Sequence, residues 1–227
     1  MALIMKIIAL LSVAIAVGCG VVSSSSNTDT VSLPEFPVAA TETEVQKGMQ
    51  TAVFAGGCFW GVEAVFESIK GVKNARSGYA GGDARSANYD DVSSGRTKHA
   101  EAVLVTFDPA KVTYAQLLNV FFSVVHDPTE VNRQGPDVGP QYRSAIFYTD
   151  ETQKKTADAY IGVINESKVF EKPVATQVTP LTKFYDAEEY HQNYLVRNPT
   201  QPYIVIHDMP KLEALKAKFP DLYVAKK

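Results

Sequence analysis

An apolar strand, a two-glycine turn and an amphipathic helix follow one another in the segment Ala52-Val53-Phe54-Ala55-Gly56-Gly57-Cys58-Phe59-Trp60-Gly61-Val62-Glu63-Ala64-Val65-Phe66. Apolar residues recur at helical spacing after the glycines, so Cys58 lies at or just before the first turn of the helix. Backbone N–H groups lack helical partners there and stabilise an anion. The position predicts a thiolate, because helix N-termini lower a cysteine pKa from about 8.5 to about 3.5–7.5.

Two interpretations of Cys58 are open on this pattern. Free cysteine is among the most buried residue types, so an inert buried thiol is the simpler one. A residue that only fills space belongs on the apolar face of an element, whereas Cys58 stands in a glycine-flanked turn that a second molecule can approach. Phe59 and Trp60 follow it and supply apolar walls. We therefore interpret Cys58 as a reactive thiol.

The first 50 residues differ in composition from the rest of the chain. Residues 1–17 are almost wholly apolar with a lone Lys6, and they end in Ala16-Val17-Gly18-Cys19. The run is short for a membrane span and has the small-residue end of a cleaved export signal, which we predict over residues 1–18. A cysteine at this point resembles the lipobox of bacterial lipoproteins, in which cleavage before Cys19 accompanies its acylation. A plain signal peptide without lipid is the alternative.

The serine-rich polar tract after Cys19 has no reason to pack, so residues 19–50 are predicted to form a flexible tether on a lipid anchor. Residues 51–227 are predicted to form one catalytic domain. The expected location is the bacterial cell envelope, facing the periplasm or the cell exterior, with the membrane reached through the lipid at Cys19. Lipidation or removal of Cys19 leaves Cys58 as the single usable thiol, because the chain has two cysteines.

Composition narrows the choice of partners. The chain has 227 residues and a net charge of −3, and it shows no extended basic patch, so we expect no nucleic-acid partner. One thiol and four scattered histidines lack the spacing of a metal site, so we expect no metal. We expect a monomer.

The apolar patterns predict strands over residues 51–55, 72–79, 99–107 and 143–149, and helices over residues 59–69 and 113–125. Their β-α-β-β-α-β order is the split βαβ, or ferredoxin-like, arrangement of an α+β two-layer sandwich. Residues 83–98 and 126–142 are predicted to be long loops, the second one ordered. Additional helices are expected over residues 150–167, 186–196 and 209–219, and a strand over 174–179.

Other residues whose side chains could take part in catalysis are Glu101 and a cluster of aromatic and titratable residues near residue 190. Strand alternation places His99 and Glu101 on one face, and burial there raises the pKa of a carboxyl and keeps it protonated as a general acid. A solvated glutamate at a strand end is equally compatible with the pattern. At helical spacing His191 and Tyr194 share a face.

Together these stretches resemble the A-type peptide methionine sulfoxide reductases, which reduce the S epimer of methionine sulfoxide. The resemblance extends over residues 51–198. It rests on the motifs Gly57-Cys58-Phe59-Trp60-Gly61, Gly78-Tyr79-Ala80-Gly81-Gly82, His99-Ala100-Glu101, His126-Asp127-Pro128-Thr129, Asn132-Arg133-Gln134-Gly135, Gln141-Tyr142-Arg143-Ser144 and Tyr190-His191-Gln192.

The resemblance implies a role for individual positions. Cys58 matches the nucleophile and Glu101 the proton donor. The implied substrate-binding residues are Phe59 and Trp60 as the methyl pocket, Tyr89 and Tyr142 as donors to the sulfoxide oxygen, Tyr194 as a further wall, and Asp137 and His191 as polar residues that shape the pocket. The implied reaction repairs oxidised methionine, free or in proteins, through a cysteine sulfenic acid.

Many relatives clear the sulfenic acid with a second cysteine. Residues 198–227 contain none here, and Ser93 stands where relatives often have one. We therefore predict a one-cysteine enzyme without a cofactor, recycled by an external small thiol or a thioredoxin-like partner. Two rivals stay open: a Cys-His-Asp hydrolase that pairs Cys58 with His99 or His191, and a non-catalytic binding lipoprotein.

Overall fold

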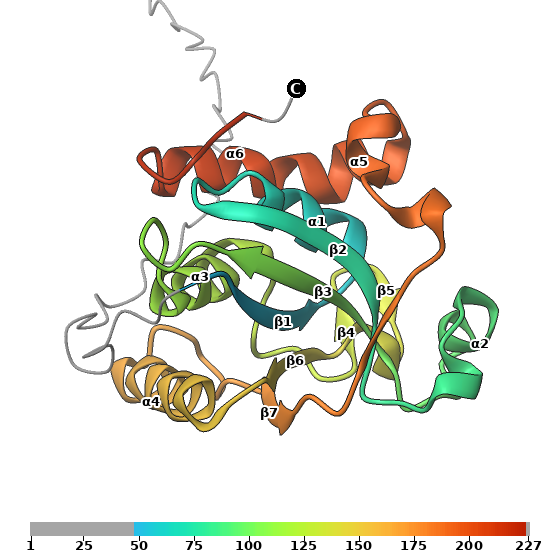
Figure 1. The fold of residues 1–227 in the computed structure, drawn as a ribbon, viewed down its shortest axis with the longest axis horizontal. Coiled ribbons are helices and arrows are strands. Elements are labelled where there is room, and N and C mark those ends of the chain that lie inside the picture. The colour runs from blue at the N-terminus through green and yellow to red at the C-terminus, as the bar shows by residue number, and fades with distance from the viewer. Residues whose placement is uncertain (1–47, 226–227) are drawn as a thin grey trace, which may run out of the picture. The chain divides into compact units, whose positions relative to one another are not determined.

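The computed structural model describes residues 48–225, which contain a six-stranded mixed sheet in the order β7-β6-β1-β3-β2-β8 (Figure 1). The four central strands pair antiparallel in the order β6-β1-β3-β2, which confirms the predicted split βαβ core. Strand β7 adds parallel to β6, and β8 adds antiparallel to β2. The strand bounds are β1 Gln50–Gly56, β2 Val72–Ala80, β3 Ala100–Phe107, β6 Ser144–Tyr148, β7 Gln177–Pro180 and β8 Phe184–Asp186, and a separate pair is β4 Arg133–Gln134 with β5 Asp137–Val138.

The helices confirm the α+β class. Their bounds are α1 Phe59–Glu67, α2 Tyr89–Ser93, α3 Tyr114–Val120, α4 Glu151–Ser167, α5 Tyr194–Arg197 and α6 Met209–Lys218. Short turns of 3₁₀ helix form at η2 Ala84–Ser86, η4 Pro140–Tyr142 and η5 Glu189–His191, and π-helical turns form at η3 Phe121–Val125 and η6 Ile204–Asp208.

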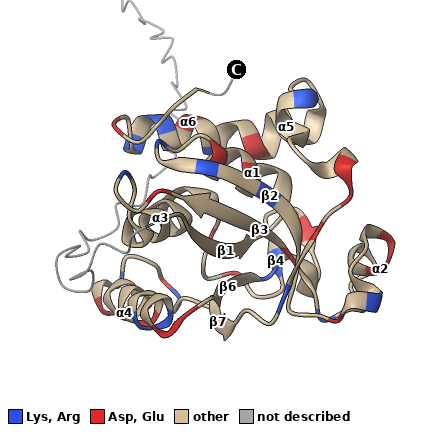
Figure 2. Ribbon diagram, viewed as in Figure 1, with Lys and Arg blue, Asp and Glu red and all other residues tan. Residues whose placement is uncertain are grey.

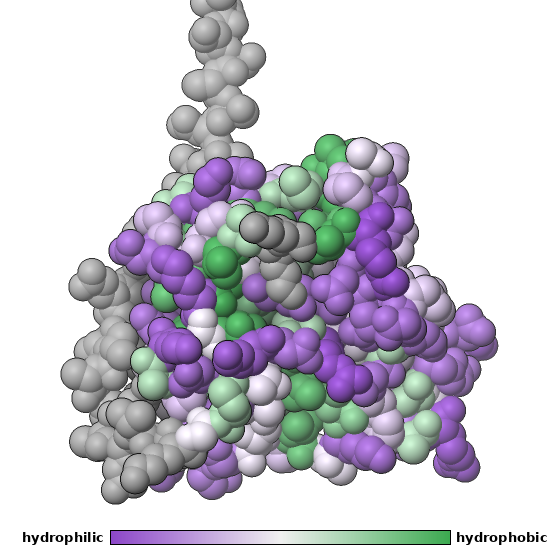
Figure 3. All heavy atoms as spheres, turned by 45° about the horizontal axis from the view of Figure 1, so that its top comes forward, coloured by the Kyte–Doolittle hydropathy of each residue, from purple (hydrophilic) through white to green (hydrophobic). Residues whose placement is uncertain are grey.

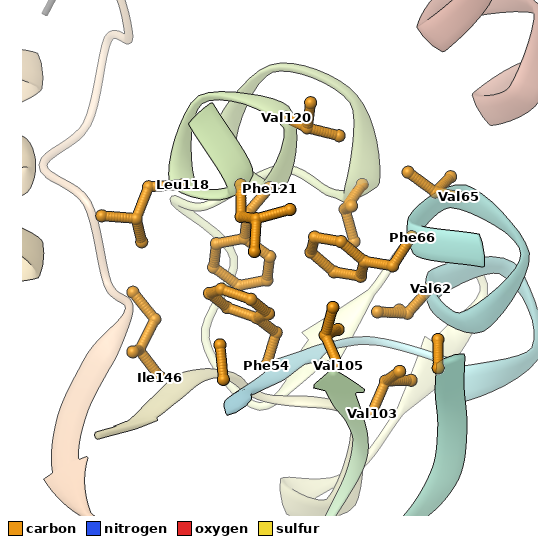
Figure 4. Packing of buried hydrophobic residues seen from close by; sticks show 14 of the residues in the cluster. Phe54, Val62, Val65, Phe66, Val103, Val105, Leu118, Val120, Phe121 and Ile146 are labelled. Atoms are coloured by element: carbon orange, nitrogen blue, oxygen red, sulfur yellow. The ribbon is translucent and has the colours of Figure 1, made fainter. Parts of the chain in front are cut away.

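The main core lies between one face of the sheet and the helices. Phe54 of β1 stacks on Phe66 of α1 with ring centroids 4.8 Å apart, and it meets Phe121 at 5.1 Å (Figure 4). Alternate residues of β1, such as Val53, point to the opposite face, where a smaller apolar cluster packs under Phe184. This packing holds the end of β1 and the start of α1 in place.

Several segments differ from the sequence prediction, among them the expected ordered loop over residues 126–142, which contains β4, β5 and η4. The expected loop over residues 83–98 contains η2 and α2, because the side chains of Asp83 and Asn88 cap these short turns by accepting backbone N–H bonds. The helix predicted over residues 113–125 has Thr113 as its N-cap but widens into η3 after Val120. The helix predicted over residues 186–196 is divided into the end of β8, η5 and α5.

Within residues 48–225, no helix combines the length and the apolar character that a membrane span requires. Acidic and basic residues are interspersed along this part of the chain (Figure 2). The predicted export signal, Cys19 and nearly all of the predicted tether lie outside the described residues.

Candidate active site

Cys58 occupies the junction between β1 and α1, as the sequence predicted. It is the N-cap of α1, and only 8 % of its surface is exposed. Gly57 before it has a φ of +94°, a conformation that favours glycine. A Cβ at Gly57 would also lie 2.7 Å from Cβ of Gln134, so the loop that carries Gln134 rests directly on the turn. Both the backbone angle and the close contact therefore require glycine beside the thiol.

Glu101 of β3 reaches the same helix end. Its carboxyl is 2 % exposed, and its Oε2 accepts the backbone N–H of Phe59 at 3.0 Å. Burial raises the pKa of Glu101 to about 8, with the Phe59 N–H opposing the shift and Asp137 adding to it. The carboxyl is therefore protonated at neutral pH, which confirms the expectation of a buried acid.

The prediction of a lowered thiol pKa is wrong for the substrate-free protein. Burial raises the pKa of Cys58 well above its ordinary value, and the negative charges of Glu101 and Asp208 raise it further. The N–H of Trp60 and the ammonium of Lys211 oppose this. The helix end thus does stabilise the thiolate, but loss of hydration outweighs it. The charge of Glu101 acts on Cys58 only where its own carboxyl is ionised, above about pH 8, so at neutral pH burial and Asp208 are the main causes of the raised pKa of Cys58.

Aromatic rings form a wall beside the thiol. Trp60 stacks on Tyr194 with centroids 3.8 Å apart and planes 10° apart, and its Nε1–H donates to Nδ1 of His191 at 3.1 Å. This bond places the proton of the neutral imidazole on Nε2. The His191 ring lies 5.0 Å from Phe59 and 4.4 Å from Tyr89, centroid to centroid. The structure thus brings these predicted pocket residues together.

Tyr142 is held by its neighbour Arg143. The guanidinium of Arg143 donates to the carbonyl oxygens of Pro140 at 2.8 Å and His99 at 3.1 Å, which ties the end of the loop to the start of β3. Burial and the nearby charge of Glu101 raise the pKa of Tyr142, and the same two causes raise that of Tyr89. Both phenols are therefore neutral donors on the side of the site that contains Glu101.

Asp137 and three residues that the sequence analysis missed complete the surroundings. Asp137 accepts the hydroxyl of Tyr203, whose ring meets Trp60 edge-on at 6.0 Å. Asp208 is fully buried and forms an ion pair with Lys211 at 3.1 Å. No local periodicity connects these three residues to Cys58, because η6 and α6 reach α1 only through tertiary packing.

The outer part of this wall is apolar. Val205 and Ile206 of η6 are exposed, as is Val196 of α5. Hydrophobic residues gather over α5 and the segment that follows it (Figure 3). Apolar surface is therefore available next to the aromatic wall.

Within residues 48–225, none of the hydrogen bonds of the histidines joins Cys58, as the base of a hydrolase would. Nε2 of His99 lies 2.9 Å from the carbonyl oxygen of Asp83, and Nδ1 of His191 is engaged by Trp60. His126 bonds the Phe121 carbonyl and the Ser144 hydroxyl. Within residues 48–225, no group of three or more His, Cys, Asp or Glu side chains is arranged to hold a metal ion.

A buried thiol and a protonated carboxyl meet at the start of α1, and two neutral phenols lie on the side of the carboxyl. Residues 50–222 match the family model described as peptide methionine sulfoxide reductase. The chain is 48 % identical over 212 residues to peptide methionine sulfoxide reductase MsrA 2 of Synechocystis sp., covering 93 % of this chain and 97 % of that one. It is 54 % identical to the MsrA 2 of Mesorhizobium japonicum, covering 79 % and 92 %.

Solved structures agree with these matches. The fold is similar to Mxr1 of Saccharomyces cerevisiae in reduced form, with a TM-score of 0.63, 34 % identity and coverage of 67 % of this chain and 87 % of that one. It is similar to methionine sulfoxide reductase A of Corynebacterium diphtheriae, with a TM-score of 0.60, 33 % identity and coverage of 74 % and 85 %. The chain therefore belongs to the peptide methionine sulfoxide reductase family, A type. It is an oxidoreductase that reduces methionine-S-sulfoxide with a thiol and thereby repairs oxidised proteins.

Proposed function

We propose that Cys58 is the nucleophile of this reaction and Glu101 its acid. The observation that carries the proposal is the bond from the Phe59 N–H to Glu101, because it brings a protonated carboxyl to the residue next to the thiol. Glu101 donates its proton to the sulfoxide oxygen, and Tyr89 and Tyr142 donate hydrogen bonds to it as charge builds there. Phe59 and Trp60 receive the S-methyl group, with Tyr194, His191 and Asp137 shaping the pocket around it.

The chemical step transfers one oxygen atom. The Cys58 thiol loses its proton, and its sulfur forms a bond to the sulfoxide sulfur. The protonated oxygen then forms a bond to the Cys58 sulfur as its bond to the substrate sulfur and the sulfur–sulfur bond both break. The oxygen ends on Cys58 as a sulfenic acid, and the substrate leaves as methionine. The proton from the thiol replaces the one that Glu101 gave up. The overall reaction therefore converts a thiol and a sulfoxide into a sulfenic acid and a thioether, and it takes up no proton from solvent.

Recycling of Cys58 requires a thiol from outside the chain. Cys58 is the free cysteine of the described residues, and the sequence holds only Cys19 besides it. A first external thiol condenses with the sulfenic acid and releases water, and a second breaks the mixed disulfide and restores Cys58. A small thiol or a thioredoxin-like protein supplies both. The apolar surface of Val196, Val205 and Ile206 offers a thioredoxin-like protein or a protein substrate a place beside the site.

One assay tests the class, the stereochemistry and the recycling together. Resolved R and S sulfoxides of a methionine peptide are supplied with thioredoxin or with dithiothreitol, and methionine is quantified. We expect only the S epimer to react, with one dithiol consumed per turnover. After one turnover without reductant, mass spectrometry should find Cys58 with one added oxygen. A disulfide between Cys58 and Cys19, or turnover by the Cys58→Ser variant, would contradict the proposal.

We further propose that the enzyme is an exported, monomeric lipoprotein of the bacterial envelope. The apolar residues 1–17 and the Ala16-Val17-Gly18-Cys19 sequence support export and lipidation. Expression of the full chain in a bacterial host with radiolabelled palmitate should label the protein at Cys19, and the Cys19→Ser variant should be unlabelled. Wild-type protein that carries no palmitate label and is found outside the membrane fraction would contradict the lipid anchor. A dimer detected by light scattering would contradict the monomeric state.

A further inference from the structure

Glu188 joins two tyrosines that are far from it in the sequence. Its Oε2 accepts the hydroxyl of Tyr79 at 2.8 Å, and its Oε1 accepts the backbone N–H of Tyr89 at 2.8 Å. The two partners lie 109 and 99 residues away along the chain. Both carboxylate oxygens are therefore used to connect the segment before His191 with β2 and with the start of α2.

The bond from Tyr89 to Glu188 satisfies a backbone N–H that has no partner within α2. Tyr89 is the first residue of α2, a helix of five residues. Its one side-chain cap is Asn88, whose side-chain oxygen accepts the backbone N–H of Asp91. The N–H of a first helical residue has no partner within its own helix. A single turn this short has little stability of its own, so an outside acceptor decides where its first residue lies. Glu188 is that acceptor.

The same segment also holds the ring of Tyr89. Glu188 is the N-cap of η5, and its carbonyl oxygen accepts the N–H of His191 at 2.9 Å. The His191 ring lies 4.4 Å from the Tyr89 ring, centroid to centroid. Tyr89 is therefore held at its backbone by Glu188 and at its ring by His191, two parts of one turn.

The electrostatic state of Glu188 suits this task. Burial acts to raise its pKa, but the N–H of Tyr89, its own N–H and the Tyr79 hydroxyl outweigh burial, so the pKa lies below its ordinary value. The carboxylate is therefore ionised at neutral pH. Hydrogen bonds to an ionised acceptor are shorter and stronger than neutral ones.

We propose that Glu188 is a positioning residue for catalysis: by holding the backbone of Tyr89, it sets the place of the Tyr89 hydroxyl toward the sulfoxide oxygen. This inference rests on the role assigned to Tyr89 under the proposed function. It assigns Glu188 no contact with the substrate. A displacement of about 1 Å in a catalytic group can slow a reaction up to about 100-fold, so the loss of this bond has a measurable cost.

A double-mutant cycle tests the proposal. The value of kcat/KM for methionine-S-sulfoxide is measured for the wild type, Glu188→Ala, Tyr89→Phe and the double variant. Glu188→Ala should lower kcat/KM about tenfold when Tyr89 is present and less than about twofold in the Tyr89→Phe background. Equal effects in both backgrounds, or no effect of Glu188→Ala while Tyr89→Phe slows the reaction, would overturn the positioning role alone. No effect of Tyr89→Phe would instead contradict the role given to Tyr89 in the proposed function, and this inference with it.

Matched variants separate positioning from general stability. Glu188→Gln should keep kcat/KM within about threefold of the wild type, because the amide oxygen can accept the Tyr89 N–H and the amide nitrogen can donate to Tyr79. Glu189→Ala, at the exposed neighbouring glutamate, should leave kcat/KM unchanged. If Glu188→Ala does not fold, Glu188→Asp takes its place in the cycle, because the shorter side chain cannot span both partners. The alkylation rate of Cys58 should be the same in all of these variants, since a general disturbance of the site would change it.

Discussion

The backbone N–H of Phe59 donates to Oε2 of Glu101 at 3.0 Å, so the proposed acid is hydrogen-bonded to the residue that follows the proposed nucleophile. The bond opposes the rise in the pKa of Glu101 that burial causes, yet this pKa still reaches about 8. The carboxyl is thus protonated at neutral pH without being far from ionisation. This balance suits a group that gives up a proton in each turnover and takes it back.

Replacement of Glu101 by Gln tests the acid. We expect the single-turnover rate at pH 7 to fall about 100-fold or more, because the amide cannot transfer a proton. Iodoacetamide should nevertheless alkylate Cys58 at pH 7 at about the wild-type rate, because Glu101 is already mostly neutral there and the variant changes the charge beside the thiol little. The wild-type kcat/KM should decline as the pH rises through about 8, and the variant should lack this decline. An unchanged rate would exclude Glu101 as the acid.

The ion pair between buried Asp208 and partly exposed Lys211 should shift the pKa of the Cys58 thiol through two opposite charges. Asp208 raises the pKa of Cys58 and Lys211 lowers it. Asp208→Asn should therefore speed alkylation of Cys58 at pH 7 several-fold, and Lys211→Met should slow it. Lys216→Met, an exposed lysine on the same helix, serves as the control for charge. Shifts of the same sign in the first two variants would show that they act through local packing instead.

Gly61 should not tolerate alanine, although it lies inside α1. Helix propensity alone predicts that Gly→Ala stabilises by about 1 kcal/mol. A Cβ at Gly61 would lie 2.1 Å from Oδ1 of Asp208, whereas a Cβ at Gly162 of α4 would meet nothing within 4 Å. In urea unfolding we expect Gly61→Ala to destabilise by about 1–3 kcal/mol and Gly162→Ala to stabilise by up to about 1 kcal/mol. A stabilised Gly61→Ala variant would mean that Asp208 is free to move away.

Glu63 should make stability depend on pH. Its side chain is 1 % exposed, and burial and then the charge of Glu67 raise its pKa from 4.5 to about 7. Between these two pH values the folded protein binds the proton and the unfolded chain does not. The free energy of unfolding therefore falls as the pH rises from about 4.5 to about 7 and stays low above that.

Glu63→Gln removes this ionisation and keeps an oxygen that can accept the N–H of Asn193. Its stability relative to the wild type should grow by up to about 3 kcal/mol between pH 4.5 and pH 8, measured by urea unfolding. Glu213→Gln, at an exposed position of α6, should show no such growth. A constant difference between Glu63→Gln and the wild type would contradict the raised pKa.

The sequence by itself determined the features that depend on near neighbours. The turn at Gly57 and Cys58, the helix after it and the start of the next helix near residue 113 were all predictable, because their bonds join residues within one helical turn. The β-α-β-β-α-β order followed from the same local periodicities, and the shared motifs brought Glu101, Tyr142 and His191 into one family site.

Only the tertiary structure decided how these residues act on one another. The bond between Phe59 and Glu101 spans 42 residues and that between Trp60 and His191 spans 131, so no periodicity contains them. Tyr203, Asp208 and Glu188 are likewise brought near these residues by contacts between distant parts of the chain. The direction of the Cys58 pKa shift was reversed for the same reason. The helix end that favours the thiolate is a local feature, but the burial that outweighs it comes from packing between distant parts of the chain.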